Sequence, residues 1–165
     1  MRRAFAILLA ILLPSGPAAA EALKDAVLAA HNAERAAVGT APLTWSDTMA
    51  AHAAGWARHL ADIGRLEHSQ ASDRPGEGEN LWMGTAGGYT PREMVAGWTN
   101  EKADFRPWSF PDVARDGRWQ SVGHYTQMIW GGTTQIGCAL AASPQWDVLV
   151  CRYAPPGNLI GAAPF

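Results

Sequence analysis

The sequence predicts one domain of the α+β class, or a layered α-β-α sandwich. The chain has 165 residues, which suit a single domain, and its 48% apolar and 17% charged residues exclude a disordered chain. Segments with helical spacing come first, whereas segments with strand character follow residue 134. Because helices and strands are segregated along the chain, the α+β class is favoured over an alternating α/β fold.

The N-terminus has the pattern of a secretory signal. A short basic region precedes the apolar run Ala4–Leu13, and small residues follow at Ala18–Ala20. We therefore expect a signal peptide over residues 1–20, cleaved after Ala20, and a mature domain over residues 21–165 in a secreted or periplasmic location. The apolar run is too short to span a bilayer, so no membrane span is expected.

The charge balance limits the partners. The net charge is −2 and becomes −4 once cleavage removes Arg2 and Arg3. A mildly acidic domain argues against nucleic acid or an anionic membrane as its main partner. Few lysines beside many alanines and arginines suggest a bacterial source of high GC content.

Two helices are expected in the first third of the mature chain. Glu21–Val38 has helical composition, and Gly39 is suited to end the helix. Ser46 can cap a second helix, which has apolar residues at helical spacing and ends at Gly64.

The middle of the chain mixes loop and helix. Residues 67–88 are expected to form a long loop with room for a short strand around Leu81–Met83. Thr90 to Glu93 is a capping box with Pro at the first helical position, so a third helix should run over Pro91–Ala103. A short helix is expected over Ser121–Trp130.

The C-terminal part predicts a β-hairpin that carries both cysteines. Gln135–Ala142 and Trp146–Tyr153 read as strands joined by a turn, in a register that places Cys138 opposite Cys151. Export places the two thiols in an oxidising compartment, which favours a disulfide, and two free buried thiols are the alternative. Closing a loop of about 14 residues would stabilise the fold by about 3 kcal/mol.

Two histidines and two acids stand out as candidates for chemistry. His68 opens the polar loop, and His124 lies in an apolar stretch. Glu79 precedes Asn80, Leu81 and Trp82. Glu101 shares a face of the third predicted helix with Trp98, and a carboxylate on an apolar helix face needs a partner. If the four meet, they offer ligands for a divalent metal or a general acid/base set. The other histidines lie on predicted helices and are expected to be structural or solvated: His31, His52 and His59.

Several motifs resemble those of the CAP superfamily, which includes cysteine-rich secretory proteins, insect venom antigens and plant pathogenesis-related proteins. The matches occur in family order and cover nearly the whole mature chain. The segments that carry the resemblance are His31–Asn32 with Arg35, Pro42–Trp45, His68–Ser69, Gly78–Trp82, Trp98–Glu101, Gly123–Trp130 and Val150–Asn158.

The resemblance implies a three-layer α-β-α sandwich with a central cleft. It assigns the cleft to His68, Glu79, Glu101 and His124, with the two histidines as ligands of Zn²⁺ or another divalent metal. The cysteine pair matches family positions that carry a disulfide. The same motif places two further side chains near the cleft, Tyr125 and Gln127.

This sequence departs from the family pattern at a few positions. Val122 stands where the family often has a cysteine, and the further cysteines of plant and animal relatives are absent from the sequence. The sequence has no cysteine-rich C-terminal extension, so channel blocking of the venom type is not implied. None of these departures touches the four cleft residues.

Three functions are open at this stage. The first is a secreted binding module whose cleft or nearby groove takes a small molecule, a lipid or a cell-wall component, with metal supporting the site. The second is a metal-assisted hydrolase, in which Glu79 or Glu101 would be the general base; a metal-free variant would use both acids on a glycosidic bond. The third is a non-catalytic interaction module, in which the four residues only hold the fold together.

Overall fold

The computed structural model describes residues 16–165, and most of the predicted signal peptide lies outside this range. Its helices are α1 (Pro17–Val38), α2 (Asp47–Ile63), α3 (Pro91–Thr99) and α4 (Gly123–Ile129), with short 3₁₀ turns η1 (Ala71–Asp73), η2 (Asn100–Asp104) and η3 (Trp119–Ser121). Its strands are β1 (Thr44–Trp45), β2 (Gly78–Thr85), β3 (Gln135–Ala142) and β4 (Trp146–Ala154).

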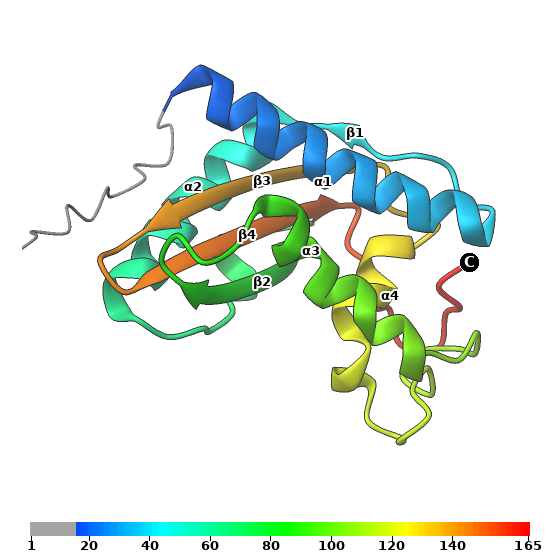
Figure 1. Cartoon of the computed structure of the whole chain (residues 1–165). Helices are drawn as coiled ribbons and strands as arrows, with labels where there is room; N and C mark the ends of the chain where they lie inside the picture. The colour runs from blue at the N-terminus through cyan, green and yellow to red at the C-terminus, as the bar shows by residue number, and fades with distance from the viewer. Residues whose placement is uncertain (1–15) are drawn as a thin grey trace, which may run out of the picture.

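The strands form one sheet in the order β1-β3-β4-β2. β1 is parallel to β3, whereas β4 pairs antiparallel with both β3 and β2. β2 is therefore an edge strand (Figure 1). It pairs with β4 although the two strands lie far apart in the sequence.

Helices cover both faces of the sheet and confirm the single layered α+β domain. One core joins α1, α3 and α4 to a sheet face that includes Leu149, Cys151 and Tyr153. The other joins α2 to the opposite face through Leu81, Val148 and Val150. Successive strand residues point to opposite faces, so β4 contributes alternately to the two cores.

Local signals in the sequence set several boundaries. The Ser46 hydroxyl accepts a hydrogen bond from the Met49 amide at the start of α2, and the Thr90–Glu93 capping box opens α3. Gly39 and Gly64 end α1 and α2 with φ of 81° and 66°, a left-handed conformation that glycine adopts without strain.

The hairpin has the predicted register. Cys138 lies opposite Cys151, Leu140 opposite Leu149 and Ala142 opposite Asp147. The two cysteines form a disulfide, so the alternative of free thiols is wrong.

Other boundaries differ from the prediction. α1 begins at Pro17, because Ala18–Ala20 continue the helix that was expected from Glu21. The third helix stops at Thr99, since residues 100–104 tighten into a 3₁₀ turn. The last helix begins at Gly123, and a separate 3₁₀ turn precedes it.

The largest correction concerns residues 67–88, which were expected to be mostly loop. Gly78–Thr85 form an eight-residue strand paired along its whole length with β4. Gly, Glu and Asn have low strand propensity, and pairing with a distant strand overrides it.

No helix within residues 16–165 combines the length and apolar character needed to cross a membrane.

Candidate functional site

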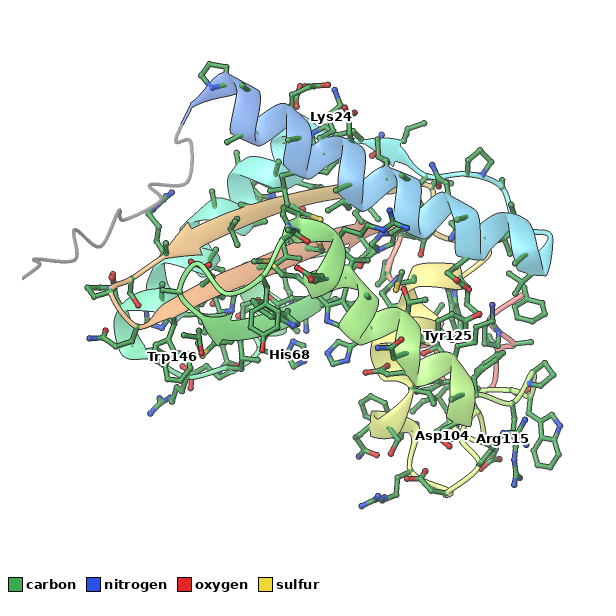
Figure 2. The ribbon with its side chains drawn as sticks, viewed as in Figure 1. Lys24, His68, Asp104, Arg115, Tyr125 and Trp146 are labelled. Carbon is green, nitrogen blue, oxygen red and sulfur yellow. A yellow bond between two sulfur atoms is a disulfide. The ribbon has the colours of Figure 1, made fainter. Side chains whose placement is uncertain are left out.

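The candidate site lies at the edge strand β2, where two consecutive residues serve opposite faces of the sheet. Glu79 points to the same face as Leu81, the face covered by α2. Asn80 points to the other face, where α1, α3 and α4 pack, and its side chain donates a hydrogen bond of 3.1 Å to the His124 carbonyl. The site therefore wraps around the edge of the sheet, with His68 beside β2 (Figure 2).

His68 and Glu79 form the first imidazole–carboxylate pair. The His68 Nδ1 lies 2.7 Å from Glu79 Oε1, and the Ser69 amide donates to the same oxygen at 3.1 Å. Glu79 Oε2 accepts from the Ser69 hydroxyl at 3.0 Å and lies 3.1 Å from Arg152 Nη2. The Glu79 side chain is fully buried, whereas that of His68 is 57% exposed.

Opposing effects act on the Glu79 carboxylate. Burial raises its pKa, but the hydrogen bond from His68, the charge of Arg152 and the Ser69 amide together bring the pKa below its ordinary value. Glu79 is therefore ionised at neutral pH, and all of its four contacts favour the charged form.

His124 and Glu101 form the second pair. The His124 Nδ1 lies 2.6 Å from Glu101 Oε1. Glu101 Oε2 accepts hydrogen bonds of 3.0 Å from the backbone amides of His124 and Tyr125, at the start of α4. The Trp98 ring stacks on the His124 imidazole with centroids 5.9 Å apart. The carboxylate thus fixes the ring and the backbone of the same residue.

Both pairs leave the same ring nitrogen, Nε2, free of the carboxylate. A carboxylate only accepts hydrogen bonds, so in the neutral form of each ring Nδ1 carries the proton and Nε2 retains its lone pair. Carboxylate–histidine pairs of this kind commonly orient metal ligands. The donor set therefore suits a divalent metal of the Zn²⁺ type. Among residues 16–165, however, no three His, Cys, Asp or Glu side chains are grouped so that they could hold a metal ion.

Tyr125 and Gln127 are buried, and their polar groups are engaged elsewhere. The Tyr125 hydroxyl donates to Glu34 Oε2 at 3.4 Å, and burial together with Glu34 raises the pKa of Tyr125 to about 12. The Gln127 amide donates to Thr133 Oγ1 and accepts from the Gly157 amide, at 3.2 and 2.9 Å. Gln127 therefore ties α4 to the C-terminal segment.

Three residues of the site were not singled out from the sequence: Ser69, Asn80 and Arg152. Arg152 offered a usable signal, since it directly follows the apolar run Val148–Cys151, where a buried cation requires an acid. Asn80 was marked only by its place in the family segment Gly78–Trp82, next to Glu79.

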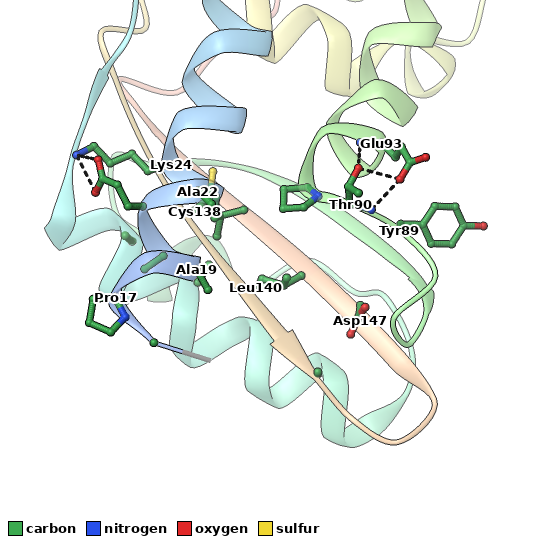
Figure 3. Close-up of a pocket in the computed structure, with 18 of the residues that line it drawn as sticks. Pro17, Ala19, Ala22, Lys24, Tyr89, Thr90, Glu93, Cys138, Leu140 and Asp147 are labelled. Atoms are coloured by element: carbon green, nitrogen blue, oxygen red, sulfur yellow. Dashed lines mark hydrogen bonds and ion pairs between the residues drawn. The ribbon is translucent and has the colours of Figure 1, made fainter. Parts of the chain in front are cut away.

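A separate groove lies between the start of α1, the loop before α3 and the sheet. Its volume is about 1000 Å³, and its lining is mainly apolar, with Leu23, Tyr89 and Leu140 among the larger side chains (Figure 3). Pro17, Ala19 and Ala20 also line it, so cleavage after Ala20 would open this end of the groove. Its lining includes none of the four site residues.

The tryptophans differ in burial. Trp98 and Trp130 are buried in the cores. Trp108, Trp119 and Trp146, from loops and a strand edge, are exposed by 56, 39 and 37%.

Comparisons with known proteins agree with this architecture. The model of the cysteine-rich secretory protein (CAP) family matches residues 28–153. Pathogenesis-related protein 1C of Nicotiana tabacum is 37% identical over 159 residues, which are 96% of this chain and 90% of the relative. Pathogenesis-related protein PR-1 of Medicago truncatula is 36% identical over 144 residues, 86% of this chain and 79% of the relative.

Solved structures share the fold at lower identity. The crystal structure of NaASP2 with Zn²⁺ superposes with a TM-score of 0.74 at 24% identity, covering 88% of this chain and 85% of that one. BmVAL-1 has a TM-score of 0.71 at 22% identity, with 92% and 83% covered. The sequence match across most of the chain and the shared fold lead to one conclusion: this chain belongs to the CAP family of cysteine-rich secretory proteins.

Proposed function

We propose that this chain is a secreted binding protein whose His68 and His124 hold a divalent metal ion, and whose apolar groove takes a small lipid-like molecule. The observation that carries the metal part is the pairing of each Nδ1 with a carboxylate, which leaves each Nε2 available as a metal ligand. The exposure of both imidazoles, 57% for His68 and 33% for His124, gives an ion access to them.

The contacts of Glu79 and Glu101 favour a role in orienting the histidines over a role as general base. Glu79 and Glu101 accept several hydrogen bonds each, and these bonds orient the histidines and the backbone around them. A general base needs a free lone pair directed at its substrate. Two protein ligands are also fewer than the three usual for catalytic zinc, so water would complete the coordination sphere.

The groove supports the ligand part of the proposal. The apolar side chains that line it beyond Ala20, such as Leu23, Trp45 and Leu140, are typical of sites that bury small apolar ligands. Membership of a family of secretory proteins and the predicted signal peptide support a ligand that is met outside the cytoplasm. Mass spectrometry of the exported protein would show a new N-terminus at Glu21.

Calorimetric titration of metal-stripped protein with Zn²⁺ tests the metal site. We expect one ion per chain, and at least tenfold weaker binding after His68→Ala or His124→Ala, because each change removes one of two protein ligands. His59→Ala is the matched control: this exposed histidine of α2 faces Glu67 and should leave affinity unchanged.

Two outcomes would contradict the proposal. One is the absence of binding up to about millimolar Zn²⁺, which would mean a binding free energy weaker than roughly 4 kcal/mol. The four residues would then be a structural polar network. An equal loss of Zn²⁺ affinity in all three variants would indicate that the ion binds elsewhere.

A further inference from the structure

Asn80 connects the two imidazole–carboxylate pairs. It follows Glu79 on β2, and Glu79 holds the His68 ring. Its own Nδ2 donates to the His124 carbonyl and to the Tyr153 hydroxyl, both at 3.1 Å. Asn80 is only 2% exposed, so water does not compete for these bonds.

A buried chain of hydrogen bonds supports Asn80 from behind. The His31 Nδ1 lies 2.8 Å from the Val27 carbonyl, and its Nε2 lies 2.9 Å from the Tyr153 hydroxyl. Since a carbonyl can only accept, the proton of the neutral ring is on Nδ1 and Nε2 accepts from Tyr153. The Tyr153 oxygen is then free to accept from Asn80, so each hydrogen bond in this network has one defined donor and one defined acceptor.

In this arrangement both histidines are anchored to the same strand, β2. His68 is tied to the strand through the Glu79 side chain, and His124 is tied to it through the Asn80 side chain. The two anchors are consecutive residues that point to opposite faces of the sheet. Loss of the second anchor would free the start of α4 from the strand while leaving the His124–Glu101 pair intact.

We propose that Asn80, braced by Tyr153 and His31, is a positioning residue that sets the spacing of His68 and His124, and hence allows one metal ion to bind both. The inference rests on the proposed function. Asn80 touches no metal itself and acts through the backbone of His124.

The test must separate positioning from general stabilisation. Pulsed electron paramagnetic resonance of protein loaded with one equivalent of Cu²⁺ counts the imidazoles on the ion. In the unaltered protein we expect two, and in Asn80→Ala mainly one, together with about 10–100-fold weaker Zn²⁺ binding, the usual effect of losing a group that orients metal ligands.

Val148→Ala provides the matched control. Val148 is fully buried in the α2 core on the other face of the sheet, so its truncation weakens the fold without touching the chain of hydrogen bonds. This variant should keep two imidazoles on Cu²⁺.

Tyr153→Phe keeps the test usable if Asn80→Ala does not fold. It preserves the ring volume and the bond from Asn80 to His124 but removes the brace, so a partial loss of the two-imidazole signal is expected. Two imidazoles retained in both folded variants, or lost equally in Val148→Ala, would overturn the positioning role. If the unaltered protein itself fails to show two imidazoles on Cu²⁺ and fails to bind Zn²⁺, the proposed function is overturned instead.

Discussion

At the scale of single residues, the site shows how buried polar groups are satisfied. Glu79 accepts from His68, Ser69 and Arg152, so its burial costs less than that of an isolated carboxylate. His31 shows the opposite case, a titratable group that is buried in its neutral form. Burial, with a smaller contribution from Arg35, lowers the pKa of His31 to about 4, against the raising effect of its bond to Val27, and the ring is neutral at pH 7.

The pKa of His31 predicts a loss of stability in mild acid. Its folded value, about 4, lies below the ordinary value of 6.5, so the unfolded chain binds the proton first. Stability contributed by the neutral ring is complete above about pH 6.5 and falls as the pH drops toward 4. Between about pH 7 and pH 5 the free energy of unfolding should fall by about 2 kcal/mol from this residue.

Denaturant titrations at several pH values would measure this slope. His31→Gln should be less stable at pH 7 and should lose most of the slope, because it no longer titrates. His59→Ala, an exposed histidine, should keep the slope of the unaltered protein. A slope unchanged by His31→Gln would show that another group titrates in this range.

At the scale of elements, the fold depends on close packing of α2 against the sheet. A Cβ added at Gly137 of β3 would collide with the Ala50 amide nitrogen, the Ser46 carbonyl and Met49 at the start of α2. Two of these atoms are backbone and cannot rotate away. Glycine at this position therefore sets how closely the second layer approaches the sheet.

Gly137→Ala should lower the free energy of unfolding by about 3 kcal/mol or more, because the helix must shift as a unit. Gly55→Ala is the matched control within α2, where an added Cβ meets nothing within 4 Å. This second change should raise stability by up to about 1 kcal/mol through helix propensity. Thermal unfolding of both variants measures the contrast, and similar destabilisation in the two would refute the packing argument.

At the scale of the whole molecule, the metal-site candidates and the apolar groove are built by different parts of the same sheet. The histidines gather around the β2 edge, whereas the groove lies over β3 beside the beginning of α1. Leu140 of β3 lines the groove, as Figure 3 shows. The two features can therefore be altered independently.

Leu140→Trp should fill the groove and weaken binding of a fluorescent long-chain fatty acid by about tenfold, equivalent to about 1.4 kcal/mol. Zn²⁺ affinity should stay unchanged in this variant. Leu66→Trp is the control, since Leu66 is 45% exposed and lies outside the groove lining. Fatty-acid affinity that is equal in both variants would exclude the groove as the binding site.

The sequence by itself determined the features whose causes lie within a few residues. Ser46, Thr90 and Glu93 cap helices through neighbouring backbone groups, and the turn before Trp146 sets the register that joins the cysteines. The family motifs also marked the four site residues, although nothing in their local spacing showed that His68 pairs with Glu79 and His124 with Glu101. The tertiary structure alone decided the partners: Glu79 with Arg152, Asn80 with His124, and β2 with β4. These contacts join residues far apart in the chain, so they depend on how the layers pack, and local propensity carries no information about them.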